Sequence, residues 1–351
     1  MNCGIISTSH KSGSAKFEIN KLNDIRTKLI PLLDNFPLNG VKYLDYLAFR
    51  EGINIKLNEG LLMHKKHELI LGLKNSMKAK RIDFEMPLAH KINITPYWLL
   101  GLIEGEGSFS ISKSNTLNTT FYLCLTSAQA PLLKAIKDFL ISHLIREDIL
   151  KLPLDYQDSI RKVIGVYSRK ERGNSKPFIE LVVTQTGFLV DKLIPFLSGL
   201  TFATKKYKGF LDWAFITSLI YKGKHTTEKG RELIIKISNG MNLHRLTTFK
   251  EGRAEELARS LIDEVLDMDD VYIKGADGLR VHATNTTKLV SGQSFYIAAD
   301  KLNGERIIFK SSETCADYFG VTSVTVNSRI SKRLPISYKN SIDYTLTRIP
   351  L

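Results

Sequence analysis

Hydrophobic and polar residues alternate along two stretches near the middle of the chain, residues 108–114 and 120–126. A period of two residues is typical of strands with one buried face, and the polar residues 115–119 between them predict a hairpin. The expected buried face carries Phe109, Ile111, Phe121, Leu123 and Leu125. The expected solvent face carries Ser110, Ser112, Thr120, Tyr122 and Thr126. We therefore expect a strand hairpin with a hydroxyl-rich outer face.

The same pattern predicts further elements around this hairpin. An apolar helix precedes it, and an amphipathic stripe predicts a helix over residues 128–141. Residues 163–167 and 178–183 predict two more strands, and another helix follows through residues 189–194. Further helices are expected from Phe210 and after Thr227, which is a good N-cap residue. The order helix, two strands, helix, two strands, helix predicts an α+β domain over residues 91–247.

Residues 1–90 resemble the later part of this domain and indicate an internal duplication. Residues 42–49 parallel 206–213, and residues 59–77 parallel 227–241. Phe36-Pro37-Leu38 is matched to residues 194–197. Residues 69–74 resemble the apolar run at 99–105 only superficially, because they lack its acids, and we expect them to be core. The first copy is therefore predicted to be partial.

The pattern changes after residue 247. A short amphipathic helix is expected over residues 254–266, and residues 248–293 as a whole are interpreted as a connection. Residues 294–299 and 306–309 predict two strands around the turn Asn303-Gly304. Two helices follow, over residues 311–320 and 324–330. Residues 294–351 are therefore expected to form a small module with a strand pair and a helix-turn-helix, or a plain helical hairpin.

The apolar run at residues 99–109 carries the most specific chemistry. Gly101 and Gly105 lie one helical turn apart, which is costly in a helix unless another helix packs closely on them. Glu106 then falls at the helix C-terminus, where a carboxylate meets a negative macrodipole. A bound cation removes this conflict, because carboxylate and carbonyl oxygens are the ligands of Mg²⁺ and Ca²⁺. An apolar helix with an exposed acidic C-cap is an equally open reading.

The run Leu-Leu-Gly-Leu-Ile-Glu-Gly-Glu-Gly, residues 99–107, resembles the signature of the LAGLIDADG homing endonucleases. The resemblance implies an αββαββα saddle whose signature helix pairs with a second one through Gly101 and Gly105. It implies that Glu106, with the carbonyl of Gly105, holds a metal. Glu104 lies roughly 200° away around the helix, so it is assigned a structural role. Lys206, and Lys42 in the partial copy, match the basic residue of the family's cleft, so Lys206 is a candidate catalytic residue.

Composition favours a polyanionic partner. The chain has 351 residues and a formal net charge of +14. Three distant cysteines indicate neither a zinc site nor a disulfide framework, and no apolar run reaches the length of a membrane span. A soluble protein without a membrane partner is therefore expected. Candidate DNA-contacting residues are Ser110, Ser112, Lys113, Thr120, Tyr122 and Thr126 on the hairpin, and Thr325, Asn327, Ser328 and Arg329 on the last helix.

The resemblance implies an intron-encoded, mitochondrial endonuclease that cuts double-stranded DNA at a long site with Mg²⁺ or Mn²⁺. Only one acidic motif is present, so a second polypeptide or a second copy is considered as the source of the other signature helix. Two other functions stay open at this point. They are an intron maturase that binds its host intron RNA, as some members of the family do, and a DNA-binding relic that no longer cleaves.

Overall fold

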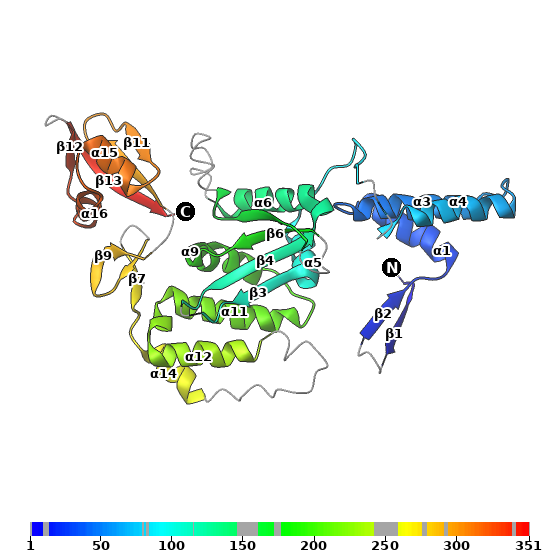
Figure 1. The fold of residues 1–351 in the computed structure, drawn as a ribbon, viewed down its shortest axis with the longest axis horizontal. Helices are drawn as coiled ribbons and strands as arrows, with labels where there is room; N and C mark the ends of the chain where they lie inside the picture. Colours follow the sequence, from blue (N-terminus) through cyan, green and yellow to red (C-terminus); the bar gives the residue numbers. More distant parts are fainter. Residues whose placement is uncertain are drawn as a thin grey trace. The chain divides into compact units, whose positions relative to one another are not determined.

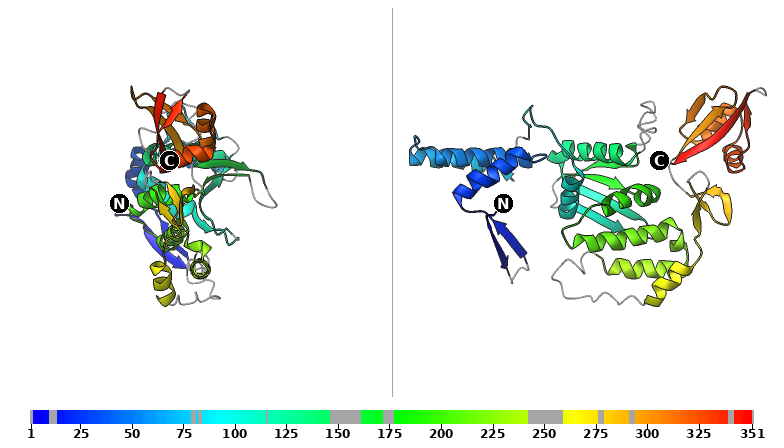
Figure 2. Two further views of the ribbon diagram at one scale, coloured as in Figure 1. Left: turned by 90° about the vertical axis from the view of Figure 1, so that its left-hand side faces the viewer. Right: turned by 180° about the vertical axis from the view of Figure 1, so that it is seen from behind.

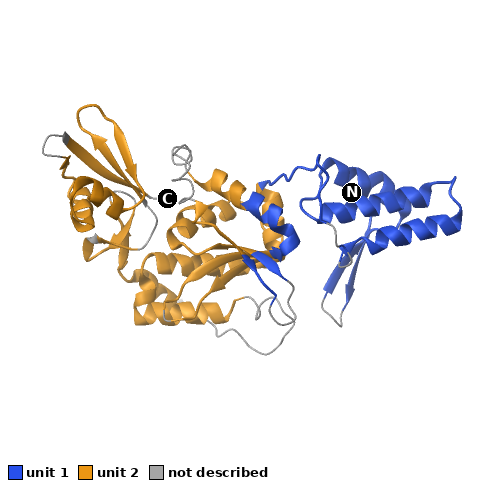
Figure 3. Cartoon of the chain, turned by 45° about the horizontal axis from the view of Figure 1, so that its top comes forward, with its two compact units in different colours: residues 1–95, 125–136, 168–179 blue, residues 96–124, 137–167, 180–351 orange. Residues whose placement is uncertain are grey.

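We describe the fold from a computed structural model that places residues 2–9, 14–78, 81, 84–114, 116–145, 161–171, 177–241, 259–275, 279–290, 294–338 and 342–350. The structure divides into two compact units (Figure 3). The first comprises residues 1–95, 125–136 and 168–179, and the second comprises the rest of the chain. No helix among the described residues is long and apolar enough to cross a bilayer.

Residues 96–241, called the motif half below, contain the predicted order of helices and strands (Figure 1). The elements are α5 (Pro96–Glu106), β3 (Gly107–Ile111), β4 (Thr119–Thr126), the turn η3 (Ser127–Gln129), α6 (Ala130–Leu144), β5 (Gly165–Arg169), β6 (Phe178–Val183), α9 (Thr186–Phe188), η4 (Leu189–Leu193), α10 (Ile194–Ser198), α11 (Lys206–Tyr221), η5 (Lys224–Thr226) and α12 (Glu228–Asn239). The αββαββα prediction is therefore confirmed for this half, and Thr227 caps α12 by accepting a hydrogen bond from Gly230 N.

The four strands form one sheet in the order β3-β4-β6-β5. β3 and β4 are antiparallel and place Ser110 opposite Thr120. Helix α11 packs against the inner face of β3, where the ring of Phe109 lies 5.4 Å from that of Phe210 and 5.0 Å from that of Trp213. Helix α12 lies beside α11, which the views in Figure 2 also show. Phe109, Phe121 and Leu123 are buried as predicted, whereas Ile111 and Leu125 are half-buried.

The N-terminal elements repeat part of the motif half, most of them at one offset. They are β1 (Ile5–Ser9), β2 (Ser14–Glu18), α1 (Leu22–Asp24), η1 (Ile25–Leu29), α2 (Ile30–Asn35), α3 (Lys42–Leu57) and α4 (Met63–Asn75). Helix α3 begins at Lys42 and α11 at Lys206, an offset of 164, which also relates α1 to α9 and η1 to η4. The match of Phe36-Pro37-Leu38 to residues 194–197 is therefore wrong, because Pro31 is the counterpart of Pro195.

Both copies contain the same break in a helix. Each has a π-helical turn, η1 or η4, followed by a helix whose second residue is proline, Pro31 or Pro195. Proline lacks an N–H and its ring clashes with the carbonyl four residues earlier, so the regular hydrogen-bond ladder cannot continue past it. Widening the preceding turn is one way to accommodate this break.

The N-terminal segment buries few apolar side chains. Among its described residues only Leu44, Tyr46 and Ile53 are buried hydrophobics. Helix α4 buries none, so the expectation that residues 69–74 are core is wrong for the described chain. Large exposed apolar side chains include Ile5, Ile6, Phe17, Phe36, Leu62, Met63, Leu69 and Leu71. This segment therefore lacks the packing that α5, β3, β4 and α6 provide in the motif half.

The described residues from 259 to 290 contain more secondary structure than the sequence predicts. Helix α14 (Arg259–Asp267) covers the described part of the expected helix, and residues 254–258 lie outside the described residues. The stretch interpreted as a connection contains a three-stranded antiparallel sheet, β7 (Tyr272–Lys274), β8 (Arg280–His282) and β9 (Asn285–Leu289). These strands are too short to give a clear alternating pattern, although Val281 is buried.

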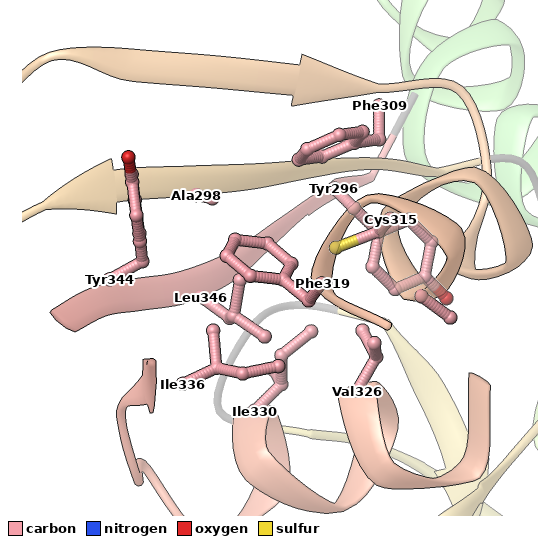
Figure 4. Close-up of a cluster of buried hydrophobic side chains, with 11 residues drawn as sticks. Tyr296, Ala298, Phe309, Cys315, Phe319, Val326, Ile330, Ile336, Tyr344 and Leu346 are labelled. Atoms are coloured by element: carbon pink, nitrogen blue, oxygen red, sulfur yellow. The ribbon is translucent and has the colours of Figure 1, made fainter. Parts of the chain in front are cut away.

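The C-terminal module is a four-stranded sheet with two helices. Its sheet order is β11 (Arg306–Phe309), β10 (Ser294–Asp300), β13 (Ile342–Pro350) and β12 (Ile336–Tyr338). The predicted strand pair is confirmed, whereas β12 and β13 were not predicted. Helices α15 (Ser312–Phe319) and α16 (Ser323–Ser331) begin at the side-chain caps Ser311 and Thr322, and Gly320 (φ +66°) ends α15. Phe319 packs among Ile330, Leu346 and Tyr344, which joins both helices to the sheet (Figure 4).

Candidate nucleic-acid cleavage site

Helix α5 has one buried face and one open face. Leu99, Leu100 and Ile103 are buried in the motif half, while Gly101, Gly105 and Tyr97 are exposed on the other side. A Cβ atom built on Gly101 or Gly105 meets no atom within 4 Å. The two glycines that the sequence assigns to a helix interface therefore face open space in the part of the chain that the structure describes.

Glu106 ends this helix with its side chain exposed. Its carboxylate and the Gly105 carbonyl are hard oxygen donors, which suit a divalent cation such as Mg²⁺. Among the described residues, however, no group of three His, Cys, Asp or Glu side chains could hold a metal ion. The metal-binding role of Glu106 therefore stays a prediction.

Lys206 binds the C-terminal end of α5. Its Nζ donates to the carbonyl oxygens of Ile103, at 3.1 Å, and Gly107, at 2.5 Å. Burial lowers the pKa of Lys206, and the charges of Glu106 and Glu104 counteract part of that shift. The ammonium thus places a positive charge where the helix macrodipole is negative. Lys206 therefore supplies a positive charge at the helix end where the sequence predicts a cation.

Glu104 binds the N-terminal end of the neighbouring helix α11. Its carboxylate accepts hydrogen bonds from the backbone N–H groups of Ala203, at 3.1 Å, and Thr204, at 2.7 Å, just before α11. Partial burial raises the pKa of Glu104, but the hydrogen bonds from Thr204 and Ala203 and the charge of Lys206 outweigh it, so the net pKa is lowered. This geometry agrees with the structural role assigned to Glu104.

The two copies differ at their basic residue. Lys206 is half-buried against the end of α5, whereas Lys42, at the equivalent first position of α3, is exposed. The described first copy contains no counterpart of α5 for Lys42 to bind. The role that the resemblance gives to Lys42 therefore stays a prediction.

The predicted DNA-facing residues of the hairpin are not equally accessible. Ser112, Lys113 and Thr126 are exposed, and Ser110 and Tyr122 are half-buried. Thr120 is only 7% exposed, so it does not lie open on the outer face as predicted. Lys113 Nζ donates a hydrogen bond to Oδ1 of Asn239, the last residue of α12. The sequence analysis missed Ser108 and Cys124, which continue the alternation of the outer face and are exposed.

The predicted contact residues of the last helix divide in the same way. Arg329 is exposed and Ser328 is half-buried. Asn327 Oδ1 accepts hydrogen bonds from Tyr296 OH, at 3.1 Å, and Arg348 Nη1, at 3.3 Å, which hold α16 on the sheet. The Thr325 hydroxyl lies 3.0 Å from that of Thr322 at the N-cap.

Val324 is a residue of this helix that the sequence analysis missed. It lies in the first turn of α16 and is 75% exposed. The N-terminal residues of the second helix contact base edges in helix-turn-helix proteins, and apolar groups there contact thymine methyl groups. A β-branched residue at a solvent-facing position of the helix is the signal that could have identified it.

A family model described as LAGLIDADG endonuclease matches residues 1–53 and 99–217. The chain belongs to the LAGLIDADG endonuclease family. The two matched segments end at equivalent positions of the duplicated copies, 53 and 217, which agrees with the offset between α3 and α11. The signature helix of this LAGLIDADG chain is therefore α5, and its acidic residue at the helix end is Glu106.

Curated relatives of this LAGLIDADG chain come from fungi. It is 25% identical over 246 residues to the uncharacterized mitochondrial protein RF1 of Saccharomyces cerevisiae, which covers 70% of this chain and 50% of the relative. It is 23% identical over 240 residues to the probable intron-encoded endonuclease 3 of Neurospora crassa, covering 65% of this chain and 42% of the relative. The chain thus spans about half the length of the curated relatives it matches.

Solved LAGLIDADG homing endonucleases share the fold. I-GzeII in complex with its DNA target superposes with a TM-score of 0.55 at 24% identity, over 70% of this chain and 81% of that one. I-SmaMI bound to cleaved DNA gives a TM-score of 0.54 at 21% identity, over 70% and 79%. I-SmaMI bound to uncleaved DNA in the presence of calcium ions gives 0.53 at 20% identity, over 68% and 79%.

The open space at Gly101 leads to an expectation for stability. Gly101→Leu removes a glycine from a helix interior, where glycine costs about 0.8–1 kcal/mol relative to alanine, and the new side chain meets no neighbour. Thermal unfolding of this chain alone should show an unchanged or slightly higher midpoint. Leu100→Ala on the buried face is the control and should lose about 2–5 kcal/mol. A large loss for Gly101→Leu would mean that a helix of the same chain or of a second copy covers this face.

The lowered pKa of Glu104 leads to an expectation for pH dependence. A carboxyl whose pKa is depressed in the folded state stabilises the protein above its unfolded-state pKa, and this contribution disappears as the pH falls through the folded-state value. The difference in unfolding free energy between the wild type and Glu104→Gln should therefore be largest near neutrality and shrink below about pH 4. Urea unfolding at a series of pH values measures it. A difference that is constant with pH would contradict the charged contact.

Proposed function

We propose that this chain is part of a site-specific homing endonuclease that hydrolyses phosphodiester bonds of double-stranded DNA at a long target site. The observation that carries this proposal is the exposed Glu106 carboxylate at the end of the signature helix α5. Lys206 and Glu104 hold that end in place from the start of α11. A net charge of +14 and the DNA-bound relatives support DNA as the partner.

The oxygen donors at the end of α5 support a divalent metal, for which we propose Mg²⁺ or Mn²⁺. Glu106 and the carbonyl of Gly105 would hold it, and a metal at this place supplies activation of water and stabilisation of the leaving 3′ oxygen. Lys206 keeps the helix end and its acid in position. Its ammonium has three N–H donors, of which two are used by Ile103 and Gly107, so one remains for a phosphate oxygen of the DNA.

We also propose that a second signature helix packs on the open face of α5. Gly101 and Gly105 leave that face bare, so a helix backbone can approach closely. A second helix would bring a second acid beside Glu106, which the described residues do not contain. It is supplied by another polypeptide segment or a second copy of this chain.

The N-terminal segment independently supports a missing segment of this kind. Strand β2 is the counterpart of β6, which in the motif half pairs with β4 as well as β5, whereas β2 pairs only with β1 among the described strands. Ile6 and Phe17, which lie opposite each other on one face of this hairpin, are exposed. A two-stranded hairpin is marginal alone, and one apolar face of it needs cover. A helix followed by two strands, like α5, β3 and β4, would provide a second partner strand for β2 and a cover for the apolar face.

The C-terminal module is proposed to add DNA contacts beyond the cleft. The outward face of α16 carries Val324, Ser328 and Arg329, with Lys332 directly after the helix. Recognition of DNA by the second helix of such a pair needs these solvent-facing side chains. The relatives' descriptions support an intron-encoded origin, from which we propose that the chain promotes intron mobility, and a location in mitochondria is proposed from RF1.

A DNA-binding protein that does not cleave is the second candidate, because the described residues supply one acid only. The two functions differ in one measurement. Binding of duplex DNA with no cut in the presence of Mg²⁺ would support this second candidate. Binding of the host intron RNA in preference to duplex DNA would support a maturase instead.

Glu106→Gln should abolish Mg²⁺-dependent cutting and leave DNA binding within several-fold of the wild type. The carboxylate charge is needed for the metal and not for docking, and loss of the metal ligand should cost at least about 100-fold in rate. The assay uses a plasmid pool with randomised inserts, cut in Mg²⁺ and bound in EDTA. Glu104→Gln is the matched control on the same helix and should be milder. Undiminished cutting by Glu106→Gln would refute the assignment of Glu106.

The double variant Arg329→Ala, Lys332→Ala should reduce the salt dependence of DNA binding. Each phosphate contact contributes close to one unit to the slope of log K against log salt concentration, so a slope smaller by about 1–2 is expected. The cleavage position should not move, because Glu106 lies on α5. Lys301→Ala, which removes an exposed lysine on the sheet side of the module, is the control. An unchanged slope in the double variant would show that α16 does not contact the DNA backbone.

A further inference from the structure

One lysine of the motif half is buried although no function has been assigned to it. Lys224 begins the short turn between α11 and α12 and is 1% exposed. Its Nζ donates to the carbonyl oxygens of Val265, at 2.8 Å, Leu266, at 2.9 Å, and Met268, at 2.6 Å. All three N–H donors of the ammonium are therefore used by one short stretch of backbone.

That stretch is the C-terminal end of α14. The last carbonyls of a helix have no partner within the helix and carry the negative end of its dipole. An ammonium buried among them is stabilised, whereas the same charge without partners would be costly. Asp270 lies 3.5 Å from the Nζ atoms of both Lys224 and Lys222 and balances the charge.

The backbone next to Lys224 is shaped for the same contact. Gly223 has φ +78°, and a Cβ atom on it would lie 2.8 Å from side-chain atoms of Val271 and Tyr272. Tyr272 N donates to the carbonyl of Lys222 at 3.0 Å. Glycine is needed here both for its left-handed conformation and for the close approach of residues 271–272.

The contact continues along the strands that follow. Lys274 on β7 forms an ion pair with Asp191 at 2.8 Å. Arg280 on β8 donates to the carbonyl of Tyr221 at 3.1 Å, and its guanidinium lies 4.6 Å from the centre of the Tyr221 ring. Tyr221 OH in turn donates to Asp191 at 3.1 Å. The end of α11 is thus joined to both strands.

We propose that Lys224 and Gly223 are positioning residues that fix residues 265–275 and 279–282 on the motif half. The C-terminal module then begins from a fixed point instead of from a free linker. The same face of B-DNA recurs once per helical turn, roughly every 34–36 Å. A module that starts from a fixed point can therefore contact the DNA only at a set number of base pairs from the cut. We call the contacts of Lys224 and Gly223 with residues 265–272 the joint. The consequence for DNA rests on the proposed function, whereas the joint itself does not.

The joint is tested without DNA by pulsed electron paramagnetic resonance on the full chain. Spin labels are attached through Ser198→Cys on α10 and Lys288→Cys on β9, with Cys3 and Cys124 changed to serine and Cys315 left buried in its core. We expect a narrow distance distribution in this background. Lys224→Met should broaden the distribution about twofold by releasing α14 and β7 from the turn.

Lys229→Met is the matched control. Lys229 joins α12 to Glu264 of α14, but both side chains are about half exposed, so this pair should contribute little and the narrow distribution should persist. Gly223→Ala is the second variant, used if Lys224→Met does not fold, and should broaden the distribution as well. A broad distribution in the background, or a narrow one in both joint variants, overturns the proposal.

The consequence for DNA is measured separately on a duplex selected from the randomised pool. Inserting half a helical turn, roughly five base pairs, between the cut and the module's contacts should weaken binding by the wild type and weaken binding by Lys224→Met less. If no duplex is bound at all, the proposed function fails while the distance measurement still decides the joint. Equal loss in both proteins, with a broadened distance in Lys224→Met, would show that the joint does not set the spacing.

Discussion

Two helix ends of opposite polarity hold each other in the motif half, and the position of Glu106 depends on this pair. Lys206, the first residue of α11, donates to the last carbonyls around the end of α5. Glu104, near the end of α5, accepts from the amides just before α11. Each side chain neutralises the dipole of the other helix, so neither end needs an external ion to be stable. The metal proposed at Glu106 would therefore serve the chemistry and not the fold.

The sequence predicted this half because its signals are local and strong. The alternation at residues 108–126 and the glycine–acid run at 99–107 predicted the β3–β4 hairpin and helix α5, with Phe109, Phe121 and Leu123 on the buried face. What could not be predicted came from tertiary neighbours. Thr120 is buried although the alternation predicts an outer position, and Asn327 accepts hydrogen bonds from Tyr296 and Arg348 on distant strands. The strands β7–β9 are three to five residues long, too short for a periodic pattern.

The duplication shows what the same residue does in two surroundings. Lys42 and Lys206 hold equivalent positions, yet only Lys206 has a helix end to bind among the described residues. The role of this lysine is therefore defined by its neighbour and not by its own helix. The broken helix with its proline recurs in both copies because the proline that requires it is local to each.

Uneven burial has a consequence for how the chain loses its structure. The motif half contains a continuous core around Phe109, Phe210 and Trp213, whereas residues 1–95 bury only three large apolar side chains among those described. Cooperative unfolding requires that the parts of a chain share packing, and regions with little burial open at a small cost in free energy. The N-terminal segment is therefore the part that proteases and chaperones of the cell meet first, before the motif half has begun to melt.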